Sequence, residues 1–331
     1  MKLLITGGCG FIGSNLIRHL LNQHPDWQIT NLDRLTYAAN PANLTEIEKN
    51  PNYRLIVGGI EDPDIALAAL KGCEAVINLA AETHVDRSIL DPAPFIRTNV
   101  LGTQVLLDNA RRAGIKRFLH VSTDEVYGSL RPDDPPATEE NPLQPRSPYA
   151  ASKAAADLLV LAAYQTYKLP VIILRPSNNY GPYQFPEKLI PLAVTNLIEG
   201  KEVPIYGKGE NIRDWVYVED TCWAIETILL QGTPGEIYNA GGGCEKRNID
   251  LIKIVLNLLG QNEAMIEFVP DRPGHDLRYA LNNTKIKQLG WQPVTDLNTG
   301  LVRTVRWYTD HPEWWQPLKL RLARESRGFW T

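Results

Sequence analysis

Two carboxylates stand side by side in the stretch HVSTDEVYG, where Asp124 and Glu125 directly follow Ser122 and Thr123. Neighbouring acids repel one another, so the pair gains little in a turn that merely ends a strand. When their surroundings separate the two pKa values, however, one acid can donate a proton while the other removes one. The pair therefore indicates a proton-transfer site; the alternative is a solvated turn.

A Tyr and a Lys four residues apart form a second candidate pair, Tyr149 and Lys153 in SPYAASKAAAD. Ser147 and Pro148 suit the cap and the first turn of a helix, on which positions i and i+4 share one face. We expect the Lys153 ammonium to lower the phenol pKa from its ordinary value of about 10. Such a phenolate can take the proton of an alcohol while a hydride leaves, and Thr123 can offer a hydroxyl to the same oxygen. A surface helix with an incidental Tyr and Lys is the alternative.

A glycine-rich stretch near the N-terminus, TGGCGFIG, fits both the GxGxxG and the GxxGxxG patterns. It follows an apolar run and opens a helical pattern, the context in which backbone N–H groups approach a pyrophosphate. Asp33 lies 20 residues beyond Gly13, where a carboxylate can bind ribose hydroxyls and disfavours a 2′-phosphate. The stretch therefore predicts NAD rather than NADP; a glycine turn without a ligand is the alternative.

Short apolar runs alternate with helical patterns through the first half of the chain, which predicts a parallel sheet with helices on both faces. The expected strands are 2–6, 28–33, 53–57, 75–80, 117–122 and 170–176, and the expected helices are 11–23, 63–70, 95–113 and 148–168. We therefore predict an α/β fold, a Rossmann-type doubly wound parallel sheet. Ligands of such sheets bind beyond the carboxyl ends of the strands, so the motifs above should gather along one rim.

After about residue 176, Pro, Gly and aromatic residues become frequent and the apolar runs become short. We expect residues 1–176 to form the dinucleotide-binding domain. Residues 177–331 should form mainly a smaller mixed α/β domain that closes over the rim. A strand and a helix over 214–230 begin a segment, about 214–240, that we expect to return to the first domain.

The bulk composition narrows the classes of partner. The 331 residues carry a net charge of −4, with a pI near 5.9, and present no basic field for nucleic acid. Four widely spaced cysteines form no CxxC pair, which favours free thiols over disulfides or a zinc site. The N-terminal apolar run is too short for a signal peptide, and none reaches the roughly 18 residues of a membrane span. We expect a cytoplasmic protein without a metal, membrane or nucleic-acid partner.

The chain resembles the extended short-chain dehydrogenase/reductase family over essentially its full length, and it closely resembles the dTDP-glucose 4,6-dehydratases within it. Nine motifs in order carry the resemblance: TGGCGFIG, LDRLTYAAN, NLAAETHVDRSI, STDEVYG, YAASKA, RPSNNYGPYQFPEKLIP, YGKGENIRDWVYVED, YNAGGG and DRPGHDLRYA. The resemblance implies an N-terminal NAD domain, a C-terminal sugar-nucleotide domain, and a homodimer formed through a bundle of the helices 95–113 and 148–168. It also implies dTDP-glucose as the substrate, and the choice of dTDP over UDP follows from the resemblance alone.

The two candidate pairs fit successive steps of a 4,6-dehydration. Oxidation at C4 of the sugar needs only the hydroxyl, the Tyr and the Lys, which leaves the two acids for another step. A C4 ketone acidifies the C5 hydrogen, so a base can remove it while an acid protonates the departing C6 hydroxyl. The stored hydride then returns to C6, and the net loss is water. By the resemblance, Glu125 is the base at C5 and Asp124 the acid at C6. Tyr149 is the base at C4, assisted by Thr123 and Lys153.

The same resemblance implies the remaining contacts, motif by motif. For the cofactor these are Gly7, Gly10, Phe11, Ile12, Gly13, Asp33, Arg34, Leu35, Thr36, Gly59, Ile60, Leu79, Ala80, Ala81, Thr83, Thr98, Tyr149, Lys153 and Asn179. For the substrate they are Thr83, His84, Thr123, Asn178, Glu187, Lys188, Leu189, Pro204, Ile205, Tyr206, Arg213, Asn248, Arg272, His275 and Tyr279. Arg213 and Arg272 are the expected diphosphate clamps, because guanidinium groups hold phosphate bidentately. For each basic residue a surface ion pair is the alternative.

One position departs from the family pattern. Relatives usually carry Gly-Asp-Ile or Ala-Asp-Ile after the third strand, and the Asp contacts the adenine amino group. Here the chain reads VGGIEDPD, with Gly59 at that position. Either the contact is lost, or Glu61 or Asp62 replaces it through a shifted turn. We expect adenine to be held differently and the NAD site to be retained.

Other functions share parts of this pattern. A UDP-sugar 4-epimerase or decarboxylase uses the Tyr–Lys oxidation but needs no acid pair directly after the Thr. A UDP-sugar 4,6-dehydratase differs only in the base of the nucleotide. A non-catalytic NAD-binding protein can be expected to lose the Tyr, the Lys or the acids, and this chain has them all.

Overall fold

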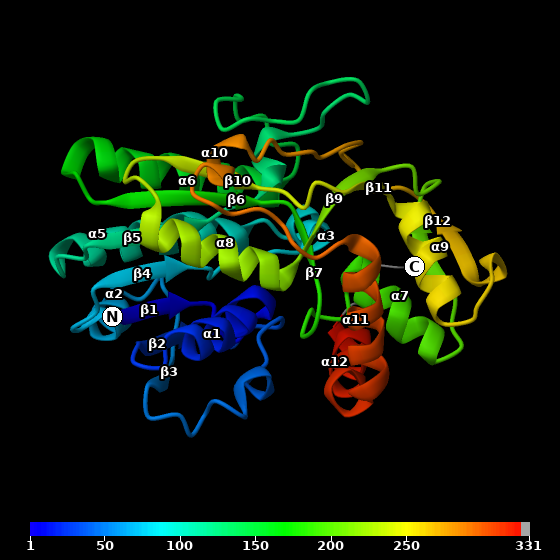
Figure 1. Cartoon of the computed structure of the whole chain (residues 1–331), viewed down its shortest axis with the longest axis horizontal. Helices are drawn as coiled ribbons and strands as arrows, with labels where there is room; N and C mark the ends of the chain where they lie inside the picture. The colour runs from blue at the N-terminus through cyan, green and yellow to red at the C-terminus, as the bar shows by residue number, and fades with distance from the viewer. Residues whose placement is uncertain (326–331) are drawn as a thin grey trace.

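The computed structural model describes residues 1–325, in which a large lobe of sheet and helices lies beside a smaller lobe (Figure 1). The last residues of the expected second domain, 326–331, lie outside the described residues. Within the described chain, no helix combines the length and the apolar character that crossing a membrane demands.

Seven strands form the sheet of the large lobe, in the order β10-β6-β5-β4-β1-β2-β3. They are β1 (Lys2–Thr6), β2 (Gln28–Asp33), β3 (Tyr53–Val57), β4 (Ala75–Asn78), β5 (Arg117–Val121), β6 (Val171–Pro176) and β10 (Ile237–Ala240). Every pairing in this sheet is parallel, which confirms the predicted doubly wound sheet. The strand order reverses between β1 and β4, and such a switch point opens a crevice for a ligand.

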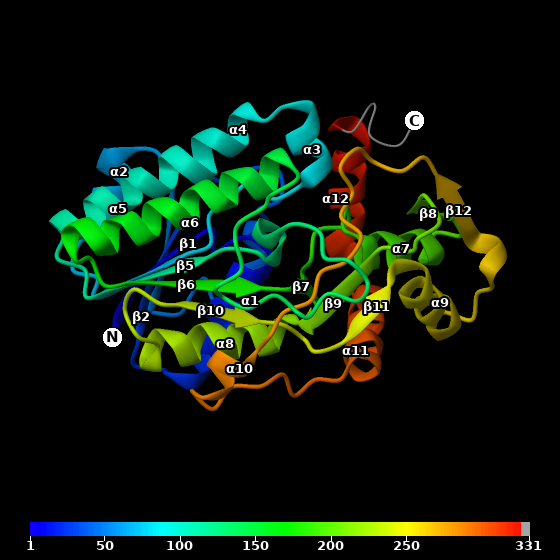
Figure 2. The same ribbon diagram turned by 90° about the horizontal axis from the view of Figure 1, so that it is seen from above.

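Helices cover both faces of this sheet (Figure 2). They are α2 (Pro63–Leu70), α5 (Thr103–Arg112) and α6 (Pro148–Tyr167) on one face, and α1 (Phe11–Gln23) and α8 (Val218–Gln231) on the other. An apolar core lies on each side because strand side chains alternate between the faces. Leu4 and Val76 belong to the core under α2 and α5, whereas Leu3, Ile5 and Ile77 belong to the core under α1 and α8.

The single helix expected over 95–113 is wrong in detail. The segments are α4 (Ala93–Phe95), a π-helix (Ile96–Gly102) and α5. A π-turn holds an extra residue, and here the widened turn carries the buried Asn99 toward the loop after β4. The Asn99 amide donates to the Glu82 carbonyl at 3.0 Å and to Ser152 Oγ at 2.8 Å, and its oxygen accepts the Glu82 N–H at 2.9 Å. This polar anchor cannot be read from apolar periodicity.

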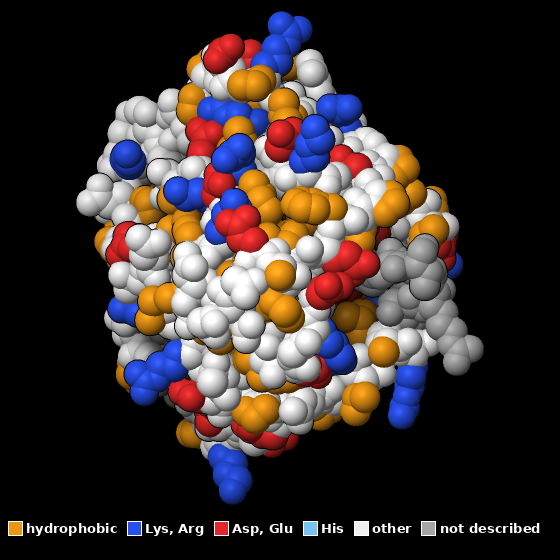
Figure 3. Space-filling model, turned by 90° about the vertical axis from the view of Figure 1, so that its right-hand side faces the viewer, with side chains coloured by type: hydrophobic (Ala, Val, Ile, Leu, Met, Phe, Trp, Pro, Cys, Tyr) orange, Lys and Arg blue, Asp and Glu red, His pale blue; other side chains and the backbone are white. Residues whose placement is uncertain are grey.

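The smaller lobe contains two short sheets, ordered β11-β9-β7 and β12-β8. Its elements are β7 (Asn178–Tyr180), α7 (Leu189–Ile198), β8 (Val203–Tyr206), β9 (Ile212–Tyr217), β11 (Glu245–Arg247), α9 (Asn248–Leu258), β12 (Ile266–Val269), α11 (Leu297–Asp310) and α12 (Pro312–Glu325). Within 214–240, β9 belongs to a small sheet, whereas α8 packs on α1 and β10 pairs with β6. The outer face of this lobe carries acidic and basic side chains intermingled with apolar ones (Figure 3).

Short helical turns complete the chain. They are η1 (Pro41–Leu44), α3 (Val85–Leu90), η3 (Asp124–Tyr127), η4 (Glu263–Met265) and α10 (Thr284–Lys287). Two of them, α3 and η3, directly follow the loops after β4 and β5, so they lie at the rim where a ligand is expected.

Candidate active site

A pocket follows the rim where β1, β2, β4, β5 and β6 end, and residues from the smaller lobe close it. All the residues expected to hold the cofactor line this pocket except Leu35. Leu35 has a φ of 58°, and its side chain packs against the apolar core under α1 and α8. This residue therefore shapes the turn after β2 and does not form part of the pocket wall.

The turn between β1 and α1 depends on glycine at two positions. Gly7 has a φ of +71°, a conformation that residues with a side chain rarely adopt. A Cβ on Gly13 would lie 2.3 Å from the Gly7 carbonyl oxygen, so a side chain there would push the helix away from the strand. Asp33, at the end of β2, accepts the N–H groups of Cys9 and Leu35, each at 2.8 Å, and burial raises its pKa. A hydrogen bond thus joins the loop after β1 to the end of β2, and both form part of the pocket wall.

The pocket extends past β3 to Gly59, the position where the family resemblance implies an Asp. Asp62 is committed elsewhere, because it caps α2 by accepting two backbone N–H groups. Glu61 lines the pocket; its Oε1 lies 2.6 Å from Arg34, and its Oε2 is buried with no hydrogen-bond partner among the described residues. A Cβ on Gly59 would lie 2.3 Å from that Oε2. Glu61 therefore occupies the space that a side chain at position 59 would need.

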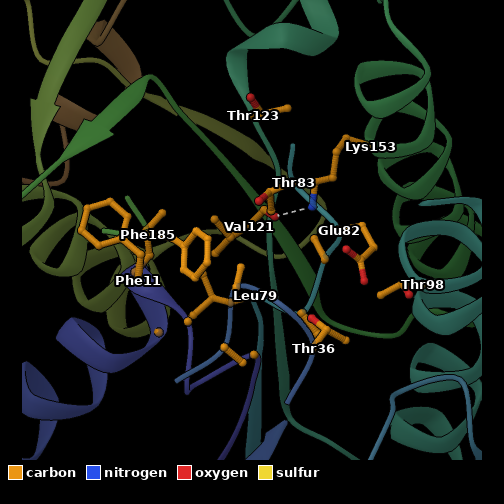
Figure 4. Close-up of a pocket in the computed structure, with 18 of the residues that line it drawn as sticks. Phe11, Thr36, Leu79, Glu82, Thr83, Thr98, Val121, Thr123, Lys153 and Phe185 are labelled. Carbon is orange, nitrogen blue, oxygen red and sulfur yellow. Dashed lines mark hydrogen bonds between the residues drawn. The ribbon is translucent and has the colours of Figure 1, made fainter. Parts of the chain in front are cut away.

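Lys153 and Thr123 lie across the pocket from Phe11 and Phe185 (Figure 4). Lys153 is buried, and its Nζ donates to the Val121 carbonyl at 2.7 Å. Burial lowers the pKa of Lys153 to about 8. The ammonium is thus held at the end of β5, where the last strand carbonyl points to it.

Tyr149 lies one turn before Lys153 on α6 and is also buried. The expectation that Lys153 lowers the phenol pKa does not hold in this structure. Burial raises the pKa of Tyr149, and the charges of Glu125, Asp124 and Asp157 raise it further, while a hydrogen bond with the Thr123 hydroxyl lowers it. The cause is geometric, since the ammonium is bound to a backbone carbonyl and carboxylates face the phenol.

Asp124 and Glu125 begin η3, which Thr123 caps by accepting the Glu125 N–H at 3.3 Å. The Thr123 hydroxyl also donates to Asp124 Oδ1 at 3.2 Å. Asp124 is 3% exposed, and its Oδ2 has no hydrogen-bond partner within residues 1–325. Both acids line the pocket beside Tyr149, so this turn is a buried, ligand-facing structure and not a solvated one.

The two acids have different electrostatic surroundings. Burial raises the pKa of Asp124 well above its usual range, and Glu125 and Asp214 raise it further. Burial also raises the pKa of Glu125, but three nearby cations oppose that rise. These cations are Arg272, Lys188 and Arg213. The surroundings therefore favour a protonated Asp124 beside an ionised Glu125.

The structure places the expected substrate contacts in two groups. Those that line the pocket are Thr83, Thr123, Asn178, Glu187 and Lys188. Those outside its lining are His84, Leu189, Pro204, Ile205, Tyr206, Arg213, Asn248, Arg272, His275 and Tyr279. Ile205 is 1% exposed in the core of the smaller lobe, and Leu189 packs against the same core. The side chains of these two residues therefore contribute to packing.

Several outer residues surround Asp86, in the first turn of α3. The Tyr206 hydroxyl donates to its carboxylate at 3.1 Å, and Arg272 and His84 lie 3.7 and 3.8 Å from it. His84 is also 3.8 Å from the carboxylate of Glu187, and burial lowers its pKa well below the usual range. This cluster joins α3 of the large lobe to the smaller lobe.

Arg213 forms a second cluster with Tyr279 and Asp276. It is buried, donates to the Asp276 carbonyl at 3.0 Å and lies 4.4 Å from the Tyr279 ring centroid. Nearby, His275 Nδ1 is 2.6 Å from Asp271, and the buried Asn248 Oδ1 has no partner in the described part of the chain. Two basic groups, Arg213 and Arg272, thus reach the neighbourhood of the acid pair from the smaller lobe.

Sequence reasoning missed other residues of the pocket wall. They include Ala38, Ala39, Glu82, Val121, Ser122, Pro176, Ser177, Gln184 and Phe185. Phe185 lies in PYQFPEKLIP, a stretch that carries the resemblance, and its aromatic side chain was the available signal. Tyr37 was missed as well: its hydroxyl donates to Glu187 at 3.0 Å, and the Arg87 guanidinium lies 3.8 Å from its ring centroid.

Comparisons with known proteins show the family of the chain. Residues 4–304 match the family model described as GDP-mannose 4,6 dehydratase. The chain belongs to this family. A dTDP-glucose 4,6-dehydratase from Streptomyces niveus is 50% identical over 324 residues, which cover 96% of each chain.

Solved structures give the same picture for the fold. The crystal structure of DesIV, a dTDP-glucose 4,6-dehydratase from Streptomyces venezuelae with NAD bound, has a TM-score of 0.94 at 50% identity and covers 96% of this chain and 100% of that one. A UDP-glucose 4-epimerase from Thermotoga maritima has a TM-score of 0.87 at 30% identity and covers 94% of this chain and 100% of that one. The resemblance to dTDP-glucose 4,6-dehydratases is thereby confirmed.

Proposed function

We propose that the protein dehydrates dTDP-glucose to dTDP-4-keto-6-deoxyglucose, as a hydro-lyase that uses NAD and regenerates it in each turnover. One observation carries this assignment: the buried Asp124 and the partly buried Glu125 share a pocket with Tyr149 and Lys153. A 4-epimerase needs only the Tyr–Lys pair, and a binding protein needs neither. Half of the 324 matched residues are identical to those of a protein named dTDP-glucose 4,6-dehydratase, which supports the same reaction.

The residues of the pocket fit NAD. The turn from Gly7 to Gly13 lets backbone N–H groups approach a pyrophosphate, and Asp33 offers a carboxylate to a ribose. Asn178 and Asn179 each carry a buried side-chain oxygen that has no partner in the described chain and can accept from a ligand. When bound, NAD⁺ accepts a hydride from C4 of the sugar and gives it back at C6.

Glu61 holds the adenine in our proposal. The family resemblance implies a carboxylate at the position of Gly59, and here Glu61 fills that space with a buried Oε2 that has no partner in the described chain. A carboxylate oxygen can accept a hydrogen bond from the adenine amino group. Arg34, 2.6 Å from the other oxygen, keeps the Glu61 side chain in place.

Tyr149 takes the proton of the C4 hydroxyl as the hydride departs. Burial and three carboxylates oppose a phenolate at this position. A protonated Asp124 removes one of these three charges, and the Thr123 hydroxyl favours the phenolate when it turns its hydrogen from Asp124 to the phenol oxygen. Lys153 adds a positive charge on the same face of α6.

Glu125 removes the C5 proton, and Asp124 gives a proton to the C6 hydroxyl as it leaves as water. The direction of proton flow follows from the surroundings of each acid. Three cations favour the ionised form of Glu125, whereas Asp124 lies buried near Glu125 and Asp214 and retains its proton. Among those cations, Arg213 and Arg272 are also placed to bind the substrate diphosphate.

We divide the chain accordingly. Residues 1–176, with α8 and β10, hold NAD, and the rest of 177–331 mainly binds the sugar nucleotide. All four cysteines are free, as in proteins of a reducing compartment, and we place the protein in the cytoplasm.

A homodimer through the helices α5 and α6 and the π-helix completes the proposal. Leu101 on the π-helix is 53% exposed and Leu158 on α6 is 59% exposed, so an apolar surface is available for a second copy. We expect Leu158→Lys to give a monomer in analytical ultracentrifugation, whereas the control Leu320→Lys, at an exposed position of α12, stays dimeric. An unchanged dimer in Leu158→Lys contradicts this interface.

The reaction is tested by incubating the protein with dTDP-glucose and NAD⁺ and following the sugar by NMR. Formation of a 4-keto-6-deoxy sugar supports the proposal. A galactose product indicates a 4-epimerase. Turnover of UDP-glucose but not of dTDP-glucose indicates a UDP-sugar dehydratase, and no turnover of either indicates a non-catalytic protein.

A further inference from the structure

Tyr37 lies behind the wall of the pocket, on the loop that follows β2. Its neighbours Thr36 and Ala38 line the pocket, whereas the Tyr37 hydroxyl donates a hydrogen bond to Glu187 Oε1 in the smaller lobe, at 3.0 Å. Glu187 is 6% exposed and lines the same pocket. The cofactor loop of the large lobe is thus joined, through one hydroxyl, to a carboxylate of the pocket wall. None of the steps described above uses Tyr37.

The position of Tyr37 is fixed by contacts that do not involve its hydroxyl. The Arg87 guanidinium lies 3.8 Å from the ring centroid. The ring of Phe185, which lines the pocket (Figure 4), packs nearly perpendicular to it with the centroids 5.7 Å apart. The Tyr37 backbone carbonyl accepts a hydrogen bond from Arg321 of α12. The hydroxyl therefore has a defined direction, and its removal leaves these contacts in place.

The two carboxylate oxygens of Glu187 have different surroundings. Oε1 accepts from Tyr37, whereas Oε2 lies 3.6 Å from Arg87 Nε, which is longer than a hydrogen bond. Burial raises the pKa of Glu187, and the charge of Asp86 adds to the rise. Lys188, Arg87 and the hydrogen bond from Tyr37 oppose it. Tyr37 stays a donor, because burial and the charge of Glu187 raise the phenol pKa well above its usual range. Oε2 can therefore accept a hydroxyl of a ligand while Oε1 is held.

We propose that Tyr37 is a positioning residue that acts through Glu187: its hydroxyl holds the carboxylate so that Oε2 accepts a hydroxyl of the substrate sugar. A carboxylate repels a diphosphate but accepts hydrogen bonds from hydroxyls, which favours the sugar as its partner. Glu187 also shares the pocket with the acid pair, where the sugar reacts. Without the Tyr37 hydroxyl, both carboxylate oxygens are available to Arg87, and the side chain can turn away from the sugar. The inference rests on the proposed function, since it concerns the substrate of that reaction.

The test compares the binding of two ligands to Tyr149→Phe protein loaded with NAD⁺, which should bind the substrate without turnover. Isothermal titration calorimetry measures the dissociation constants of dTDP-glucose and of dTDP, which lacks the sugar. Adding Tyr37→Phe should weaken the binding of dTDP-glucose about fivefold and leave that of dTDP unchanged. The matched control Tyr238→Phe removes a hydroxyl that accepts the Thr233 N–H at 3.0 Å outside the pocket lining, and it should change neither constant. Unchanged binding of dTDP-glucose in Tyr37→Phe, or an equal loss for both ligands, overturns the proposal.

A double-mutant cycle tests whether Tyr37 acts through Glu187. In a Glu187→Ala background, the further change Tyr37→Phe should no longer alter the affinity for dTDP-glucose. The same loss in that background would show that the hydroxyl acts by another route, and would overturn the proposal. Failure of the proposed function is distinct: a wild type that forms no keto sugar refutes the reaction, while the binding constants still decide the role of Tyr37. Absence of dTDP-glucose binding to the Tyr149→Phe protein overturns the inference as well.

Discussion

Two parts of the pocket surround their ionisable groups differently, one around Tyr149 and the other around Glu125. Around Tyr149, burial and three carboxylates oppose ionisation, and the Lys153 ammonium is bound to a backbone carbonyl. Around Glu125, three cations from the smaller lobe oppose the effect of burial. The surroundings of Tyr149 therefore stabilise the phenol after it has taken a proton, whereas those of Glu125 favour a carboxylate that can remove one. The contrast implies that oxidation at C4 and elimination across C5 and C6 can be separated by mutation.

Tyr149→Phe should have the largest effect, because it removes the oxygen that takes the C4 proton. The variant should therefore carry out neither the oxidation at C4 nor the elimination that depends on it. We expect turnover to fall about 10²–10⁴-fold, with no NADH absorbance after substrate is added. The edge contact of the ring with Phe95 is retained, which favours a folded variant. Turnover equal to that of the wild type, or NADH that accumulates in the variant, contradicts the assignment of Tyr149.

Glu125→Gln should retain the oxidation at C4 and stop the elimination across C5 and C6. Product formation is expected to fall about 10²–10⁴-fold, while NADH accumulates with bound substrate because the hydride cannot return. No solvent deuterium should enter C5. Full activity in this variant refutes the role of Glu125 as the base. So does exchange of the C5 hydrogen with solvent in this variant.

Asp124→Asn should act later than Glu125→Gln. The amide cannot donate a proton to the C6 hydroxyl, so we expect a loss of about 10²-fold in product. Exchange at C5 should continue, because Glu125 remains and loses an acidic neighbour. Recovered dTDP-glucose from a D₂O incubation, read by mass spectrometry, distinguishes the two variants. Loss of exchange in Asp124→Asn would show that the two acids cannot be separated.

Glu61→Gln should have the smallest effect, since it changes only how adenine is held. The amide keeps one acceptor oxygen but loses the charge that pairs with Arg34, so we expect NADH affinity to fall a few-fold, by about 1 kcal/mol. Fluorescence titration measures this, with Asp62→Asn as the control that leaves the pocket lining intact. Equal affinities for the wild type and Glu61→Gln contradict an adenine contact.

The large lobe was easier to predict than the smaller one, for a physical reason. Its motifs directly follow strands, and parallel strands bring their carboxyl ends to one rim, so chain position alone places Asp33, Leu79 and Thr123. Leu35 follows the same motif yet turns away, because its positive φ is set by the local turn.

In the smaller lobe, chain position does not predict which residues lie together. Tyr206, Arg213 and Arg272 come from three separate segments, and their neighbours Asp86 and Asp276 could be found only from the packing of the lobes. The pKa of Tyr149 could not be read from spacing either, because a shared helix face does not fix where an ammonium points.

Oxidation at C4 and elimination across C5 and C6 are tested together most directly by one incubation. The wild type is incubated with dTDP-glucose and NAD⁺ in D₂O, and the product is examined by NMR. Our account predicts a 4-keto-6-deoxy sugar with solvent deuterium at C5, and with the original C4 hydrogen transferred to C6. A galactose product without deuterium, or a 4-keto-6-deoxy product without deuterium at C5, would contradict it, because then no second acid–base step exchanges that hydrogen.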